Sequence, residues 1–299
     1  AEVEKEKLNV DMYALNDRVN DLYFGILLLD EQIKQNTLLQ DELERNYRQI
    51  TAYVENGIAN QADLDAVKVE QLNTKQKRID LVSSRAAYLK MLSLLVGEAL
   101  SPETVLEKPV PQSTVSAVSE IRRPELALFD AQGAGLQVQE KALNVRHLPQ
   151  FGLFVQGAYG NPGLNMLKNE FSPYYMAGVR LSWNFGSLYT LKNDRRVIEK
   201  KRQQLDNNRD VFLFNTRLEM TQQDQAIHSL EKQMRDDDEI IRLRTNIRKA
   251  AEAKVANGTL TVTEMLRELT NESLARQSKA MHEIQRLMGI YQLKYTIND

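Results

Sequence analysis

The sequence of 299 residues contains no cysteine, and its seven prolines all lie between residues 102 and 173. The absence of cysteine excludes disulfides, thiol catalysis and cysteine-based zinc sites. No uncharged apolar run approaches the roughly 18 residues that a membrane-spanning helix requires. The formal net charge of −2 excludes the broad basic surface that nucleic-acid binding uses. Two long flanks without proline remain, and they are free to form long helices.

Both flanks carry an amphipathic helical pattern and one strong break. Apolar residues recur at three- to four-residue spacing from Val10 to Ile33, among acidic and basic residues. The breaks are Asn56-Gly57 and Asn257-Gly258, where glycine supplies the positive φ that ends a helix. The two glycines are 258 − 57 = 201 residues apart, and the same shift pairs apolar positions of the two flanks. The flanks are predicted to be divergent repeats of helix, tight turn and helix.

The segment from Leu148 to Leu191 differs from both flanks in composition. It holds 9 of the 20 aromatic residues and 6 of the 13 glycines, but its only charged residues are Lys168, Glu170 and Arg180. Two alternating strands are predicted here, over residues 151–160 and 174–185, each close to the roughly 9–11 residues that cross a membrane as a tilted strand.

One face of the predicted hairpin suits lipid and the other suits water, with Phe154 as the misfit on the watery face. A lone hairpin leaves two unpaired edges, so copies of the chain are expected to close a shared barrel. The alternative is a hairpin that packs one face on a soluble core. In the second strand the predicted lipid-facing residues are Val179, Leu181, Trp183 and Phe185, and the predicted lumen-facing residues are Arg180 and Ser182.

Several short motifs occur in an order that resembles one family. They are Arg123-Pro124-Glu125-Leu126 at a helix start, Leu148-Pro149 before the first strand, Gly178-Val179-Arg180-Leu181-Ser182-Trp183 in the second, and Asn257-Gly258-Thr259 at the later turn. This arrangement resembles the TolC-like outer-membrane efflux proteins, the exit ducts of Gram-negative multidrug and type I export systems. Asn184-Phe185-Gly186-Ser187 departs from the proline and Phe-Asp-Gly-Gly-like turn of the family. The resemblance implies a fragment that lacks the first half of repeat one.

The implied fold is mainly α, with long antiparallel helical hairpins in two repeats and one β-hairpin that contributes to an oligomeric outer-membrane β-barrel. The implied parts are a first-repeat helical hairpin over residues 1–97 with its tip at 56–60, a connector over 98–120, a helix over 121–147, a β-hairpin over 148–187, and a second-repeat helical hairpin over 188–299 with its tip at 257–261.

The resemblance also implies a function. It is that of the outer-membrane channel of a tripartite efflux or type I export system, which conducts substrates passively and has neither enzymatic activity nor a cofactor. The implied partners are two further copies in a homotrimer of the full-length protein, a periplasmic adaptor, an inner-membrane pump and outer-membrane lipid, and the implied location is the outer membrane and periplasm of a Gram-negative bacterium. The alternative is a periplasmic coiled-coil adaptor or structural protein with a small β docking element.

The two helical tips carry the site residues that the resemblance implies. An acidic periplasmic aperture is carried onto Asp63 and Glu264, while Arg267 stands at a further acidic position of the family. Arg267 is expected to pair with Glu264, three positions earlier. The alternative for both carboxylates is an ordinary capping or solvated role near a helix start. The implied adaptor-docking residues are Asn56, Gly57, Ile58, Asn257, Gly258 and Thr259.

Other polar clusters do not predict a catalytic or metal site. The acidic run from Asp236 to Glu239 fans around a helix by about 100° per residue, so it is interpreted as a solvated face. His147, His228 and His282 lack a second histidine or carboxylate at ligand spacing. No metal site and no enzyme is therefore predicted.

Overall fold

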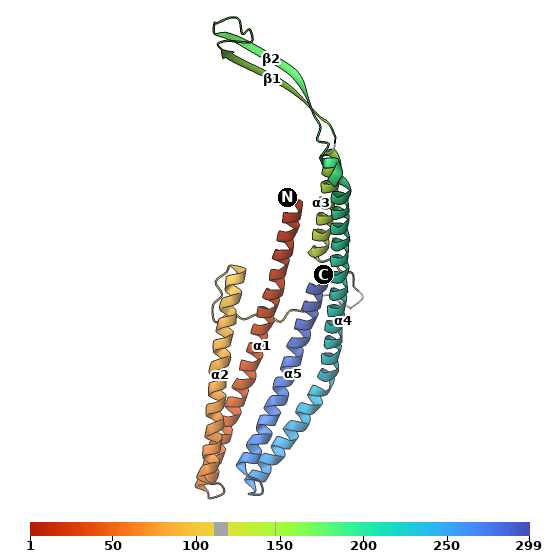
Figure 1. Cartoon of the computed structure of the whole chain (residues 1–299). Coiled ribbons are helices and arrows are strands. Elements are labelled where there is room, and N and C mark those ends of the chain that lie inside the picture. The colour runs from red at the N-terminus through yellow and green to blue at the C-terminus, as the bar shows by residue number, and fades with distance from the viewer. Residues whose placement is uncertain (111–118, 147) are drawn as a thin grey trace. The chain divides into compact units, whose positions relative to one another are not determined.

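The computed structural model describes residues 1–110, 119–146 and 148–299. Part of the predicted connector and all of His147 lie outside the described residues. The described elements confirm a mainly helical fold with one β-hairpin (Figure 1). They are helices α1 (Glu2–Glu55), α2 (Gln61–Val96) and α3 (Pro124–Arg146), strands β1 (Gln150–Gly160) and β2 (Ser172–Ser182), and helices α4 (Ser187–Ala256) and α5 (Val262–Ile297).

The helix boundaries repeat along the chain with the spacing that the sequence predicts. α1 ends at Glu55 and α4 at Ala256, and α2 and α5 begin at residues 61 and 262, so each pair is 201 residues apart. The later ends match as well, because Gly97 and Asn298 cap α2 and α5 with positive φ values of 76° and 62°. The two helical hairpins are therefore two copies of one local structure.

The chain divides into two compact units. Unit 1 contains residues 1–7 and 124–212, and unit 2 contains residues 8–123 and 213–299. In unit 1, ion pairs Arg202–Glu140 and Arg209–Asp130 join α4 to α3, at 3.0 and 2.8 Å. None of the described helices combines the length and the apolar character that a membrane-crossing helix needs.

Unit 2 packs the two helical hairpins together, and Figure 1 shows their turns at the same end of this unit. Next to the turns lies an apolar cluster to which α1, α2, α4 and α5 all contribute, which we call the tip cluster. A second cluster joins α1 to α5 through Phe24, Leu27 and Ile284. The tip cluster consists of Leu43, Ile50, Val67, Ala251, Val255, Val262, Met265, Leu266 and Leu269.

The two strands pair antiparallel from Gln150 opposite Ser182 to Gly160 opposite Ser172. The sequence pattern extended the second strand to Phe185, which is wrong, because β2 ends at Ser182. The next partner across the ladder would be Pro149, which has no N–H group to donate. Trp183 and Phe185 therefore follow the strand, with their ring centroids 4.4 Å apart.

Candidate functional site

The two turns at the tips of unit 2 have the same backbone geometry. Gly57 and Gly258 adopt φ values of 71° and 66°, the left-handed region. The amide of Gly57 donates to the carbonyl of Val54 and that of Ile58 to Tyr53, at 3.0 and 2.8 Å. The equivalent donors, Gly258 and Thr259, bond the carbonyls of Val255 and Lys254, both at 2.9 Å. This pair of bonds is the Schellman motif, which satisfies the last carbonyl groups of a helix and reverses the chain.

Replacing a tip glycine should cost stability through its backbone conformation alone. No heavy atom lies within 4 Å of the place that a Cβ of residue 258 would take. Gly258→Ala should lower the free energy of unfolding by about 1–2 kcal/mol, because an L-residue is strained at positive φ. Gly258→Asn should cost less, since asparagine tolerates this conformation. Urea unfolding of the two variants measures this difference, and equal losses would contradict the explanation.

Asp63 and Glu264 each close a capping box at the start of the helix that follows the turn. The Asn60 side chain accepts from the Asp63 amide at 3.0 Å, and the Asp63 carboxylate accepts from the Asn60 amide at 3.0 Å. Thr261 and Glu264 repeat this exchange at 3.2 and 3.1 Å. The hydrogen bonds from Thr261 hold the pKa of the Glu264 carboxyl below its usual value. Both carboxylates therefore have the capping role that the sequence left open.

The expected ion pair between Arg267 and Glu264 is not the one that Arg267 forms. The Arg267 guanidinium lies 3.5 Å from the carboxylate of Glu268, the next residue. Glu264 instead turns back to Thr261, because that threonine offers it both a backbone and a side-chain donor. Arg267 thus acts on Glu264 only through its charge.

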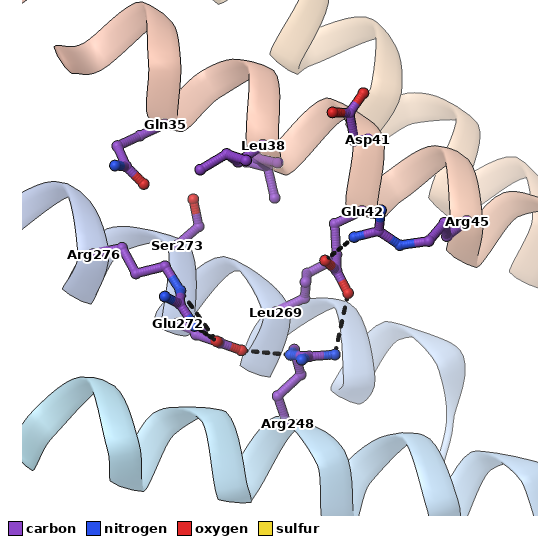
Figure 2. Close-up of a pocket in the computed structure, with 11 residues that line it drawn as sticks. Gln35, Leu38, Asp41, Glu42, Arg45, Arg248, Leu269, Glu272, Ser273 and Arg276 are labelled. Atoms are coloured by element: carbon purple, nitrogen blue, oxygen red, sulfur yellow. Dashed lines mark hydrogen bonds and ion pairs between the residues drawn. The ribbon is translucent and has the colours of Figure 1, made fainter.

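A group of charged side chains and one threonine joins the two helical hairpins next to the tip cluster, and we call it the Arg248 cluster. Figure 2 shows its members Glu42, Arg248, Glu272 and Arg276. Arg248 on α4 binds Glu272 on α5 and reaches Glu42 on α1 at 3.2 Å. The Arg248–Glu42 ion pair joins α1 to α4, the first helices of the two hairpins. The members of the cluster are Glu42, Thr245, Arg248, Glu252, Glu272 and Arg276.

Glu272 is the buried member of the Arg248 cluster, with only 5% of its side chain exposed. Burial alone would raise its pKa, but hydrogen bonds from Thr245, Arg276 and Arg248 hold the pKa of Glu272 below the usual value. Thr245 donates at 2.7 Å and Arg276 at 2.6 Å. A cavity of about 250 Å³ lies beside the cluster, lined also by Gln35, Leu38 and Ser273. Glu272 is thus a buried carboxylate that accepts hydrogen bonds from three side chains.

This burial predicts an acid-sensitive contribution to stability. The folded-state pKa of Glu272 is depressed, so its contribution is fully present above the ordinary glutamate pKa of about 4.3 and is lost as the pH falls through the folded-state value. Glu272→Gln should therefore lower stability at neutral pH and flatten the decline below pH about 4.3. Urea unfolding across this range measures both effects. The exposed Glu44→Gln serves as control, and an undiminished acid decline in Glu272→Gln would contradict the assignment.

The acidic run on α4 is not a uniformly solvated face, so that interpretation is wrong for Asp237. The Asp237 side chain is 6% exposed, and its carboxylate lies 2.9 Å from Nδ1 of His282 on α5. Asp238 pairs with Lys279, which is also on α5, at 2.5 Å. The run therefore contributes to α4–α5 packing, because one of its members falls on the buried side of the helix. Within the described ranges, no group of three or more His, Cys, Asp or Glu is placed to hold a metal ion.

The register of the β-hairpin assigns each residue of the strands to a face. Phe151, Leu153 and Val155 share a face with Leu181, Val179 and Ala177, their cross-strand partners. The large apolar side chains of this face are 59–86% exposed. Arg180 and Ser182 lie on the other face, opposite Gly152 and Gln150. The hairpin therefore presents an uncovered apolar face and a more polar face, in the alternation that the sequence predicts.

The sequence pattern did not predict the Arg248 cluster. Glu272 follows Leu269 by three positions, so it falls on the buried stripe of α5, where an acidic residue requires a partner. An acidic residue at this buried position was the signal that predicts an ion pair. The sequence does not identify the partner of Glu272, because Arg248 and Glu42 come from helices that are distant in sequence.

Comparison with known proteins supports the fold. Neither a protein-family model nor a curated protein matches the chain. Solved structures match 99% of it: the outer membrane protein VceC of Vibrio cholerae with a TM-score of 0.81 and 11% identity, the outer-membrane channel OprN with 0.77 and 12%, and the CmeC outer membrane channel of Campylobacter jejuni with 0.74 and 12%. The match covers 72%, 68% and 66% of those chains. These similarities show the fold, which is the one that the sequence motifs imply.

Proposed function

We propose that this chain, which has the fold of the TolC-like outer-membrane channels, is a subunit of such a channel and passively conducts solutes out of a Gram-negative cell. The observation that carries the proposal is the uncovered apolar face of the β-hairpin. Leu153, Val155 and Tyr175 on this face are 86%, 81% and 80% exposed. Such a face is stable in lipid and costly in water.

The hairpin requires further strands to be stable. Its two strands leave two edges of unpaired N–H and C=O groups, and in lipid every such group needs a partner. Copies of the same hairpin provide these partners when they close into a barrel. In the alternative, an adaptor protein, the hairpin would cover one of its faces by docking on another protein. That alternative accounts less well for two eleven-residue strands with alternating apolar and polar residues.

Exposed apolar stripes on the helices support assembly of copies. Val69 and Leu72 on α2 are 54% and 51% exposed, and they follow Gly57 by 12 and 15 residues. Ile247 and Leu243 on α4 are 46% and 47% exposed, and they precede Gly258 by 11 and 15 residues. The two stripes thus lie at matching heights above the tips. Packing α2 of one copy on α4 of the next is a head-to-tail contact, which forms a ring when the rotation between copies closes.

Cysteine cross-linking tests this assembly on a chain that has no cysteine of its own. We expect Leu72→Cys combined with Leu243→Cys in the full-length protein to give linked dimers and trimers in the outer-membrane fraction, with the trimer as the largest product. Each single-cysteine variant is the control and should give no trimer. Products that continue beyond three copies, or a bridge only within one chain, would contradict a closed trimer.

The tips are proposed to form the periplasmic entrance of the channel. In a trimer, Asp63, Glu264 and Arg267 would each occur three times near the axis, and the Arg248 cluster would hold the two hairpins of each subunit together behind them. The Asn-Gly turns at residues 56–58 and 257–259 would face a periplasmic adaptor, which in turn would connect an inner-membrane pump. The paired, capped geometry of both turns supports a rigid docking surface.

A further inference from the structure

Phe154 is a large aromatic residue on the more polar face of the β-hairpin. It lies directly opposite Gly178. A Cβ at residue 178 would come within 2.9 Å of two carbon atoms of the Phe154 ring. The ring therefore occupies the space that a side chain on Gly178 would need. Phe154 is 38% exposed, whereas its strand neighbours Leu153 and Val155 are more than 80% exposed.

Arg180 completes this arrangement from the same face. Its guanidinium carbon lies 5.6 Å from the centre of the Phe154 ring, within the roughly 6 Å range of a cation–π contact. No acidic residue occurs in β1 or β2, and none of the described acidic side chains forms an ion pair with Arg180. A guanidinium that stacks on an aromatic ring keeps its edge N–H groups available as donors. The paired strands thus carry one cation, which contacts an aromatic ring and has no acidic partner among the described residues.

We propose that Phe154, Gly178 and Arg180 form an anion-recognition site, the Arg180 platform, for carboxylate and other oxyanion groups of passing solutes. The proposal rests on the proposed function, in which this face of the hairpin lines the lumen. Arg180 would contact the anion, and Phe154 would be the residue that positions it. Arg180 stands two residues before the end of β2, so three copies would form a ring of cations where the strands meet the helices.

The position of the cation makes its effect measurable. A charge on a lumen wall raises the local concentration of counter-ions, and this effect weakens as salt screens the field. The screening length is about 30 Å at 0.01 M salt but only about 10 Å at 0.1 M. The influence of the Arg180 platform should therefore be greatest in dilute salt and should decrease as salt is added.

Reversal potentials of the full-length channel in planar bilayers, under gradients of dilute potassium chloride, test the proposal. Arg180→Gln should reduce the permeability ratio of chloride to potassium by about twofold or more. Phe154→Leu should give a smaller reduction, because the charge remains but loses its contact with the aromatic ring. Lys168→Gln removes the same charge from the loop between the strands and is the matched control. Migration of each variant as a trimer on a gel shows that assembly is intact.

The possible results separate this inference from the function on which it rests. An unchanged ratio in a conducting Arg180→Gln channel would overturn the inference and leave the proposed function standing. An equal reduction in Lys168→Gln would also overturn it, because net charge rather than the platform would then set the ratio. A wild-type trimer without conductance would overturn the proposed function and the inference together.

Discussion

Val155→Arg is expected to keep the full-length protein from assembling in the outer membrane, whereas Gln156→Arg is expected to assemble. Val155 lies at the middle of β1, opposite Ala177, on the uncovered apolar face. An arginine on the lipid face costs about 2–4 kcal/mol at the bilayer midplane, and a trimer would carry three of them. Gln156 is the next residue and lies on the opposite face, where water hydrates a charge.

Membrane fractionation and gel analysis of trimers measure this contrast. The two variants add the same charge to adjacent positions, so each is the control for the other. Similar amounts of outer-membrane trimer in both would contradict the assignment of faces. The same result would weaken the proposal that Val179 and Leu181 contact lipid while Arg180 and Ser182 face the lumen.

Arg248→Ala is expected to destabilise the packing of the two helical hairpins by about 3 kcal/mol, the lower end of the range for breaking a buried ion pair. The variant leaves the buried Glu272 with Arg276 as its only cation, beside the Thr245 hydroxyl, and removes the ion pair of Glu42 with α4. Arg242→Ala is the matched control, because Arg242 forms an exposed pair with Glu239 on the same helix. Such a solvent-exposed pair contributes little to stability.

Urea unfolding gives the stability of both variants, and amide hydrogen exchange of α1 and α4 near the tips shows where protection is lost. A second variant separates lost charge from lost packing. Arg248→Met combined with Glu272→Leu removes the buried charge together with its partner, so it should recover most of the stability. Equal losses in Arg248→Ala and Arg242→Ala would contradict a buried role for the cluster.

Local rules explain what could be predicted from the sequence. The Asn-Gly pairs predict both turns because glycine at positive φ is needed by the Schellman motif, whatever the surroundings. Pro124 correctly predicts the start of α3, since proline fits the first turn of a helix. The alternation of apolar and polar residues correctly predicts which residues of each strand share a face, because successive side chains of a strand point to opposite faces in every register.

Most of the errors and omissions came from contacts between distant segments. Whether Glu264 chooses Thr261 or Arg267 depends on the turn geometry, which brings the threonine donors closer. The partner of Asp237 is on another helix, and so are both partners of Arg248 on α1 and α5. The end of β2 depends on the proline opposite it. The partners of Asp237 and Arg248 on other helices have no fixed spacing in sequence, so no periodicity could identify them, whereas Thr261 precedes Glu264 at the three-residue spacing of a capping box.

Single-channel recording of the purified full-length trimer in a planar bilayer tests the central claim most directly. The account predicts discrete steps of ion conductance from the trimer, and no steps from Val155→Arg, which should not insert. A wild-type trimer that enters the bilayer and gives no steps would contradict the claim that this chain forms a conducting channel.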